Sequence, residues 1–333
     1  NCTATDGSFN ETDEAFTCTP TARSDGVHTI DVIARNRVNH DSTIRSDAVR
    51  IDTVAPTNPT TVTSSSHTLS VWSNDNTVAV AWSGASDSNS GIKGYSYSFT
   101  TSSTTIPDTT QDTTGTTATS PALANGSSWY FHVRTVDNAG NWNSGAKHYG
   151  PFFIDTSTPT NPTGFNPGCG ATSDVWQSYC AFLTASWTGA ADTGGSGVEG
   201  FYYYFGSSST GTSTDFTIYP NYNTPSAPNP SVYYFRLRTK DVAGNVSAWV
   251  TMFILRYDAE APLNPTGVDP GCTATSGVWQ NTCQDPNFTW SGATDGSGSG
   301  IAKYFYCWSS SSSCTPTTQT TTPGYDPPAG SST

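Results

Sequence analysis

Apolar and polar residues alternate with a period of two along this chain, in short runs separated by Gly, Ser, Thr, Asn and Pro. Two of these runs end on a tryptophan and carry apolar side chains at every second position: Val78, Val80, Trp82 and Leu183, Ala185, Trp187. Such alternation turns one face of a strand toward a core and the other toward solvent. No segment has the 3.6-residue period of an amphipathic helix. The pattern therefore predicts an all-β protein of short strands.

The order of these runs repeats about every hundred residues. An opening phrase occurs three times, as IDTVAPTNP at 51–59, IDTSTPTNP at 154–162 and YDAEAPLNP at 257–265. Each copy continues with the tryptophan strand, a W-[ST]-G-A-x-D phrase, an S-G-[IV] turn and an aromatic strand. Two copies end in a further strand, WYFHVRTVDNAGN at 129–141 and YYFRLRTKDVAGN at 233–245. The period predicts tandem domains of about 100 residues.

The repeat divides the chain into two complete and two partial domains. Residues 53–155 and 156–258 are complete, 1–52 hold only the C-terminal part of a domain, and 259–333 only the N-terminal part. Neither partial segment can bury both sheets of a sandwich, and each would expose strand edges. Two interpretations stay open. Either the chain is a segment of a longer array, or the tail of one subunit is completed by the head of the next through strand addition.

The tryptophan strand, the Y-x-Y strand and the Y-x-F-x-V-R-T-x-D-x-A-G-N strand together resemble immunoglobulin-like and fibronectin type III-like modules of bacterial cell-surface proteins. The D-T-V-A-P phrase is similar to the joint between such modules, and the resemblance covers essentially the whole chain. It implies tandem immunoglobulin/fibronectin III-like β-sandwiches. Tyr233 is similar to the tyrosine corner of this family, while Trp129 and His28 stand at that position in the other copies. Because proline restricts its own φ and the residue before it, the joints are predicted to be stiff and the array to form an extended rod.

Eight cysteines fall into four local couples: Cys2/Cys18, Cys169/Cys180, Cys272/Cys283 and Cys307/Cys314. The chain has no Cys-x-x-Cys knuckle of the kind that binds zinc. The couples therefore predict four disulfides and an oxidising compartment, extracellular or at the cell surface.

Charge excludes one class of partner. The net charge is −13 with only 13 Lys and Arg, so a nucleic-acid surface is not expected. No run approaches the 18 or so apolar residues of a membrane span.

Nothing in the sequence predicts catalysis. The five histidines lack metal-ligand spacing and accompany no repeated acid or nucleophile. GSGVEG at 195–200 fits a dinucleotide-binding pattern, but its counterpart GSGIAK at 298–303 lacks the third glycine and precedes a strand. We expect no enzyme and no cofactor other than a calcium ion.

A calcium site is one interpretation of the joints, where Asp52, Asp155 and Asp258 recur 103 residues apart. Further aspartates lie in inter-strand turns and offer the hard oxygen ligands that Ca²⁺ prefers: Asp87, Asp137, Asp192, Asp241 and Asp295. The alternative is that each aspartate accepts hydrogen bonds from the amides of its own turn.

Glycans are a further candidate feature of this chain. The N-x-[ST] sequons place candidate glycans at Asn1, Asn10, Asn125, Asn245 and Asn287. Serine and threonine runs at 309–313 and 317–322 also suit O-linked sugar.

One face of residues 156–258 predicts a contact surface. If the aromatic strand and the Y-x-F strand are neighbours, alternation turns five side chains inward: Phe201, Tyr203, Phe205, Phe235 and Leu237. Five others then point outward together: Tyr202, Tyr204, Tyr234, Arg236 and Arg238. The same outward positions in residues 53–155 are Ser96, Ser98, Tyr130, His132 and Arg134. Tyr and Arg are enriched at interface hot spots, so a neighbouring subunit or a carbohydrate is the expected partner.

Together these features predict a non-enzymatic extracellular structural protein, a rod of modules that forms a surface filament, stalk or sheath and contacts copies of itself. Two alternatives remain. The modules could be the stalk of a cell-surface adhesin, or the spacer of a secreted carbohydrate-active enzyme.

Overall fold

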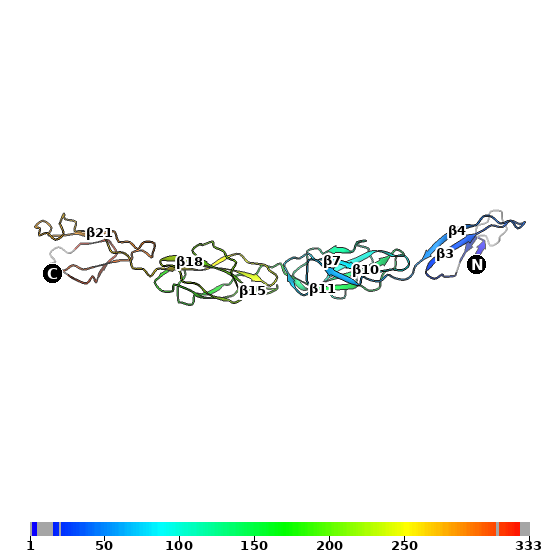
Figure 1. Cartoon of the computed structure of the whole chain (residues 1–333), viewed down its shortest axis with the longest axis horizontal. Helices are drawn as coiled ribbons and strands as arrows, with labels where there is room; N and C mark the ends of the chain where they lie inside the picture. Colours follow the sequence, from blue (N-terminus) through cyan, green and yellow to red (C-terminus); the bar gives the residue numbers. More distant parts are fainter. Residues whose placement is uncertain (1, 5–15, 20, 311–312, 327–333) are drawn as a thin grey trace. The chain divides into compact units, whose positions relative to one another are not determined.

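The computed structural model describes residues 2–4, 16–19, 21–310 and 313–326. Every regular element in this part of the chain is a β-strand, which confirms the all-β prediction. Among the described residues, no helix is long and apolar enough to cross a membrane. The chain divides into two compact units, Asn1–Ser157 and Thr158–Thr333, whose strands can be followed in Figure 1.

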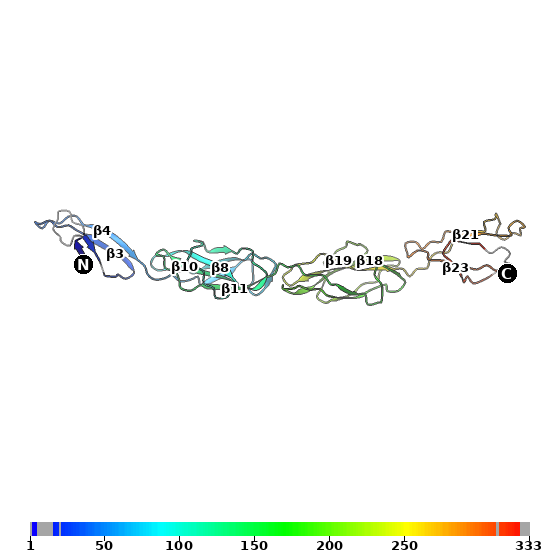
Figure 2. The ribbon, with the colours of Figure 1, turned by 180° about the vertical axis from the view of Figure 1, so that it is seen from behind.

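The first unit opens with two antiparallel pairs of strands. Strand β1 (Cys2–Ala4) pairs with β2 (Phe16–Cys18). Strand β3 (Gly26–Val32) pairs with β4 (Arg45–Ile51), and the two lie side by side in both views (Figures 1 and 2). This hairpin is the only part of segment 1–52, among its described residues, that forms a long ladder.

Segment 53–155 contains two sheets. The first has the order β5-β7-β9 and consists of β5 (Thr61–Ser64), β7 (Ala79–Ser83) and β9 (Thr117–Thr119). The second has the order β6-β11-β10-β8 and consists of β6 (Trp72–Ser73), β11 (Lys147–Ile154), β10 (Gly126–Asp137) and β8 (Ile92–Thr100). All pairs are antiparallel except β6 with β11, which is parallel.

Segment 156–258 repeats this plan in the second unit. Its smaller sheet, β12-β14-β17, consists of β12 (Gly164–Asn166), β14 (Thr184–Thr188) and β17 (Asn221–Asn223). Its larger sheet, β13-β19-β18-β15-β16, consists of β13 (Trp176–Gln177), β19 (Val250–Tyr257), β18 (Ser231–Asp241), β15 (Val198–Gly206) and β16 (Phe216–Thr217). Strands β18 and β19 lie side by side (Figure 2).

Segment 259–333 forms the beginning of the same plan. One sheet, β20-β21-β24, consists of β20 (Gly267–Asp269), β21 (Phe288–Ser291) and β24 (Gly324–Tyr325). A second ladder joins β22 (Tyr304–Tyr306) to β23 (Thr318–Thr320). No counterparts of β18 and β19 occur among its described residues.

Each complete sandwich buries its own core around one tryptophan. Trp82 stacks on Phe131 at 5.4 Å, and Trp187 meets Phe201 edge-on at 5.4 Å. The core of the first sandwich is made of Val62, Val78, Val80, Trp82, Tyr95, Leu123, Phe131, Val133, Phe152 and Ile154. The core of the second is made of Leu183, Ala185, Trp187, Phe201, Ala227, Phe235, Leu237, Phe253 and Leu255. The residues at every second position of the tryptophan strands thus lie in the two cores.

At the position of the tyrosine corner, the hydrogen bond to an upstream carbonyl is made by the residues that are not tyrosine. The indole Nε1 of Trp129 donates to the carbonyl oxygen of Ala124 at 2.8 Å. His28 Nε2 lies 2.8 Å from the carbonyl oxygen of Ser24. The side chains that depart from tyrosine therefore bond a carbonyl four or five residues upstream. The ring of Tyr233 packs on Phe205 at 5.0 Å, and its hydroxyl has no such bond within the described residues.

The outer face of β8 and β10 corrects one expectation. Ser96 and His132 were expected to face solvent, yet both are buried. Residues 101–113 fold across this face: Ser96 Oγ donates to Asp112 Oδ2 at 3.1 Å, and Arg134 Nη1 donates to the Pro107 carbonyl at 3.3 Å. Alternation assigned the face of each strand, but it carried no information about a loop covering that face.

Disulfides join three of the cysteine couples, Cys169–Cys180, Cys272–Cys283 and Cys307–Cys314. Cys18 is also disulfide-bonded. The side chain of Cys2, with which it was expected to pair, lies outside the described residues.

Candidate functional site

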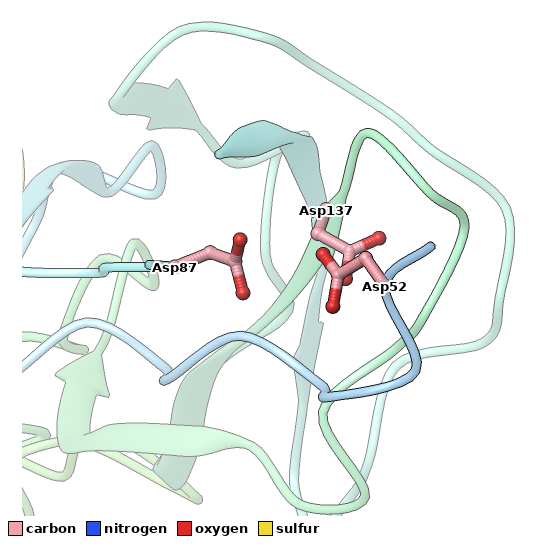
Figure 3. A group of neighbouring side chains, drawn as sticks. All are labelled: Asp52, Asp87 and Asp137. Atoms are coloured by element: carbon pink, nitrogen blue, oxygen red, sulfur yellow. The ribbon is translucent and has the colours of Figure 1, made fainter. Parts of the chain in front are cut away.

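The repeated aspartate at the first joint lies beside two turn aspartates. Carboxylate oxygens of Asp52, Asp87 and Asp137 lie within 4.8 Å of one another, and Figure 3 shows the three side chains directed toward a shared space. Asp137 ends strand β10 and is fully buried, whereas Asp52 and Asp87 are half-buried. Residues from three distant parts of the first unit thus converge at the end of one sandwich.

Backbone amides occupy much of this carboxylate cluster. Asp87 Oδ1 accepts N–H groups from Asn89, Ser90 and Gly91 at 3.1, 2.8 and 2.8 Å. Asp52 Oδ2 accepts the Ser90 N–H at 3.1 Å. The turn depends on Gly91, whose φ of +79° recurs at the matching Gly197 and Gly300 with 91° and 90°. Side chains other than glycine rarely adopt this φ, which explains the repeated S-G-[IV] phrase.

The turn that follows β10 contacts the carboxylate cluster from the other side. Asp137 Oδ1 accepts the Asn141 N–H at 2.8 Å, and Oδ2 accepts the Asn141 side-chain amide, also at 2.8 Å. That amide donates as well to the carbonyl oxygen of Asp52 at 3.0 Å. The hydrogen bond from Ser90 is the largest cause that lowers the pKa of Asp52 below 3.8, with burial acting in the opposite direction. These hydrogen bonds are the ones expected if each aspartate caps its turn, which is the alternative to calcium binding.

Calcium binding at this cluster stays a prediction, and thermal melting tests it. Oxygens of three carboxylates within 4.8 Å suit a hard cation. A Ca²⁺ concentration one hundred times Kd would stabilise the unit by about 2.7 kcal/mol. The measurement compares the Tm of the whole chain in CaCl2 with that in EDTA, with Asp87→Asn as the control that removes one ligand charge. Equal Tm values in both solutions would leave turn capping as the role of these aspartates.

The other joint aspartates also accept amide hydrogen bonds within their own unit. Asp155 Oδ1 accepts the Ser157 N–H at 3.0 Å, in the first unit. In the second unit, Asp258 Oδ2 accepts the Ser299 N–H at 2.7 Å, and Asp295 Oδ2 accepts the Gly300 N–H at 2.6 Å. The hydrogen bond from the Ser299 backbone is the largest cause that lowers the pKa of Asp258 below 3.8. Turn Asp192 accepts the Gly197 N–H and turn Asp241 the Gly244 N–H, each at 2.7 Å.

An asparagine of the opening phrase fastens the joint to its sandwich in both complete segments, although it was not among the predicted site residues. Asn161 Oδ1 accepts the Thr239 N–H at 3.0 Å and the Ser247 hydroxyl at 2.6 Å. Its amide donates to the Ala248 carbonyl at 2.7 Å. In the first unit, Asn58 accepts the Thr135 N–H at 3.1 Å in the same way. We call this arrangement the asparagine clamp. The T-N-P and L-N-P triplets in the repeated phrase were its only signal in the sequence.

Replacing the clamp residue is expected to destabilise the second unit. Asn161→Ala removes four hydrogen bonds to the end of β18 and to the residues after it, at a cost of about 1–3 kcal/mol. Urea unfolding of the whole chain measures the loss. The matched control is Asn264→Ala, at the same place in the third phrase, where the side chain is exposed and the change should stay within about 0.5 kcal/mol. Equal losses in both variants would contradict the clamp.

The expected contact surface of segment 156–258 consists of half-buried aromatic and guanidinium groups stacked on one another. Tyr202 lies opposite Arg238, and Tyr204 opposite Arg236, on the neighbouring strands β15 and β18. The Arg238 guanidinium lies 4.5 Å from the Tyr202 ring centroid and 5.2 Å from that of Trp249, a residue that the sequence analysis missed. Tyr234, the fifth member, lies opposite Gly206 at the end of the same ladder. Arg238 thus covers a face of Tyr202 that a partner would otherwise contact.

Tyr204, a member of the expected contact surface, also has a structural role. Its hydroxyl accepts the Ser208 N–H at 3.2 Å, and its ring packs closely against Gly206 and Gly211. The Gly211 carbonyl in turn accepts Arg236 Nη1 at 2.6 Å. Tyr204 and Arg236 therefore fix the turn after β15. A partner at this surface stays a prediction.

Three sequons lie in the described part of the chain. The side-chain nitrogen of Asn125 donates to Asp155 Oδ1 at 3.2 Å, and that of Asn245 donates to Asp241 Oδ2 at 2.9 Å. A glycan replaces one of the two N–H groups of the amide, so at Asn125 it would remove one of two bonds, since this nitrogen also donates to Ser157 Oγ at 2.6 Å. Asn287 is exposed and is the sterically simplest acceptor of the three. Asn1 and Asn10 lie outside the described residues.

Known proteins similar to this chain are polysaccharide-degrading enzymes by name. Chitinase A1 of Niallia circulans is 30% identical over 254 residues, 74% of this chain and 31% of that protein. Exoglucanase B of Cellulomonas fimi is 30% identical over 206 residues, 62% of this chain and 17% of that protein. Exoglucanase A of the same organism is 33% identical over 126 residues, 35% of this chain and 13% of that protein. The chain thus spans less than a third of the length of these relatives. No protein-family model matches it.

Two solved structures are similar as well. The fibronectin(III)-like modules of Clostridium thermocellum CbhA share 11% identity at a TM-score of 0.32, over 60% of this chain and 94% of that one. The chicken CNTN1 FN1–FN3 domains share 15% identity at a TM-score of 0.30, over 68% of this chain and 77% of that one. The fold assignment rests on the strands themselves. A three-stranded sheet packs on a larger sheet in the same strand order in both complete segments, and the same motifs occupy the same strands. The chain is therefore built from tandem two-sheet β-sandwiches, the fold that the resemblance to fibronectin type III-like modules predicted.

Proposed function

We propose that the chain is a non-catalytic extracellular spacer of a secreted carbohydrate-active protein. The observation that carries this proposal is the pattern of similarity. The matched chitinase and exoglucanases are much longer than the matched region, which makes up 31%, 17% and 13% of them. Modules that recur in enzymes with different polysaccharide substrates fit a part that links and separates domains better than a part that performs one reaction.

The chemistry of the modules suits that role. An asparagine clamp fastens each complete sandwich to its proline-containing joint, and a disulfide stabilises segment 156–258 in addition. The three clustered carboxylates are occupied by turn amides, and Asp137 is buried, so this cluster offers no acid–base pair to a sugar. A spacer needs stability and solubility rather than an active site.

Mass spectrometry of the native secreted protein tests the proposal. We expect these modules on the same polypeptide as a catalytic domain. We also expect the purified chain to release no reducing sugar from chitin or cellulose, with an active chitinase and an active cellulase as positive controls. A native protein made of these modules alone, or sugar release by the purified chain, would contradict the spacer role.

A surface filament or sheath, the first prediction from the sequence, is the second candidate. It is favoured by the Tyr and Arg side chains that lie together on β15 and β18, because these residue types are enriched at protein interfaces.

A further inference from the structure

Three of the four cationic side chains of segment 156–258 lie on one strand. They occupy every second position of β18, which is labelled in Figure 1, and the full set is Arg236, Arg238, Lys240 and Arg256. Alternation places the three on the outer face of the larger sheet, because Phe235 and Leu237 between them are fully buried. Side chains on one face of a strand follow one another at about 6.6–6.8 Å. The outer face therefore carries a short row of positive charge.

Only one cation of this row has its charge balanced by an acid. Lys240 Nζ lies 2.7 Å from Glu199 Oε2. Neither Arg236 nor Arg238 forms an ion pair with any described residue. A chain with a net charge of −13 thus keeps two neighbouring guanidinium groups without a counter-ion.

Arg238 is held by aromatic rings rather than by hydrogen bonds. Its guanidinium lies over Tyr202 at 4.5 Å and over Trp249 at 5.2 Å from the ring centroids. It makes no side-chain hydrogen bond to any described residue, and its Nε is buried. By contrast Arg134, at the matching position of segment 53–155, donates to two backbone carbonyls. A half-buried donor group without an acceptor carries a desolvation cost, which an acceptor on a ligand would remove.

The stacking also determines which part of Arg238 a ligand can reach. Because rings lie over the guanidinium, its edge is the part left for a ligand. That edge carries parallel N–H donors, which match the two oxygens of a carboxylate. Arg236 offers a second guanidinium two residues along the same face. The row therefore fits a ligand whose carboxylates repeat along its length.

The groups around the row favour a sugar chain as that ligand. Phe216 of the edge strand β16 is 36% exposed and contacts the Tyr202 ring at 5.1 Å, so it offers an apolar ring face beside the row. On the other side, the exposed turn 207–210 consists of three serines and a threonine, and the next carbonyl accepts Arg236 Nη1 at 2.6 Å. A uronic acid presents the matching set of groups: an apolar ring face, hydroxyls and a carboxylate.

We propose that the outer face of β15 and β18 binds an acidic polysaccharide. Arg238 and Arg236 pair with carboxylates of its uronic acid residues, and Phe216 stacks on a sugar ring. This inference rests on the proposed function and adds a partner to it, since the spacer would then hold an acidic polymer near the domains that it links. Segment 53–155 would not bind, because Arg134 is already engaged and residues 101–113 cover the same face.

Calorimetric titration of the whole chain with polygalacturonate tests the proposal. The chain should bind this polymer and should not bind the same polymer after its carboxylates have been esterified. Arg238→Gln should weaken binding by about tenfold or more, because a charge-assisted bidentate contact is lost. Arg37→Gln is the matched control, since it removes the same charge from an exposed loop residue and should leave binding unchanged. Far-UV circular dichroism should show both variants folded like the unchanged chain.

Polyglutamate tests the choice of a sugar over an acidic peptide. It carries carboxylates without sugar rings, so the chain should bind it clearly more weakly than polygalacturonate. Equal or tighter binding of polyglutamate would overturn the polysaccharide as partner. No binding of polygalacturonate, equal binding of its ester, or equal weakening by Arg238→Gln and Arg37→Gln would overturn the site itself. These results leave the spacer role intact, because that role is tested by the mass of the native protein.

Discussion

Lowering the pH from 7.5 to 5 is expected to destabilise module 53–155 by about 2 kcal/mol through His132 alone. His132 is fully buried, with Nδ1 2.7 Å from His148 Nδ1 and Nε2 2.9 Å from Thr100 Oγ1. Burial, and next the neighbouring His148, lower the pKa of His132 from 6.5 to about 4. Below about pH 6.5 this histidine binds a proton in the unfolded chain, whereas in the folded module it stays neutral until the pH approaches 4. The stabilisation is therefore complete above pH 6.5 and is lost as the pH falls toward 4.

Urea unfolding of the whole chain at both pH values measures this loss. His132→Gln should remove most of the pH dependence, because glutamine does not titrate. The second module supplies an internal control, since Arg236 occupies the matching position. The aspartates with lowered pKa lose their contribution only below their unfolded value of 3.8, outside this window; they are Asp41, Asp52, Asp75 and Asp258. The same slope in the chain and in the His132→Gln variant would contradict the assignment.

Trp187→Ala is expected to cost the second module about 3–5 kcal/mol. The side chain is 2% exposed and contacts Phe201 and Phe235 at centroid distances of 5.4 and 5.8 Å. Removing it leaves a cavity between two sheets that neighbouring rings cannot fill. The indole N–H has no hydrogen-bond partner within the described residues, so Trp187→Phe should cost markedly less.

The third copy of this tryptophan is the matched control. Trp290 lines an open groove and is only half-buried, so Trp290→Ala should cost less than half as much as Trp187→Ala. Chemical unfolding followed by far-UV circular dichroism gives both values. Similar losses at the two positions would mean that Trp290 is buried in solution as deeply as Trp187, and would contradict this expectation.

Local pattern was enough to predict the strands and most of the core, because burial on a strand follows a period of two. Phe235 and Leu237 were assigned inward from that period, and both lie in the second core. The repeated phrases predicted where each motif begins and ends. The disulfides could be predicted because each joins cysteines that are close in the sequence. The prediction worked wherever neighbours in the sequence are also neighbours in the structure.

The candidate site was harder to predict, since its contacts join distant residues. Asn161 and Thr239 are 78 positions apart, and no local period connects an asparagine in a joint to an amide in a late strand. The buried state of His132 depends on residues 101–113, whose composition is that of an ordinary polar loop. The cover of Arg238 over Tyr202 required the register of two strands and the position of Trp249. Such features follow from tertiary packing, which the alternation of side chains does not specify.

The parallel pairing of β6 with β11 has a mechanical consequence. Trp72 lies opposite Phe153, and the Asp155 N–H donates to the Ser73 carbonyl at 2.9 Å, so a strand from the beginning of the module is bonded to its last strand. A pull on the two ends of the module would load these hydrogen bonds along the strand direction, and they would have to break together rather than one after another. A short patch of backbone can thus set the force at which a module opens under tension.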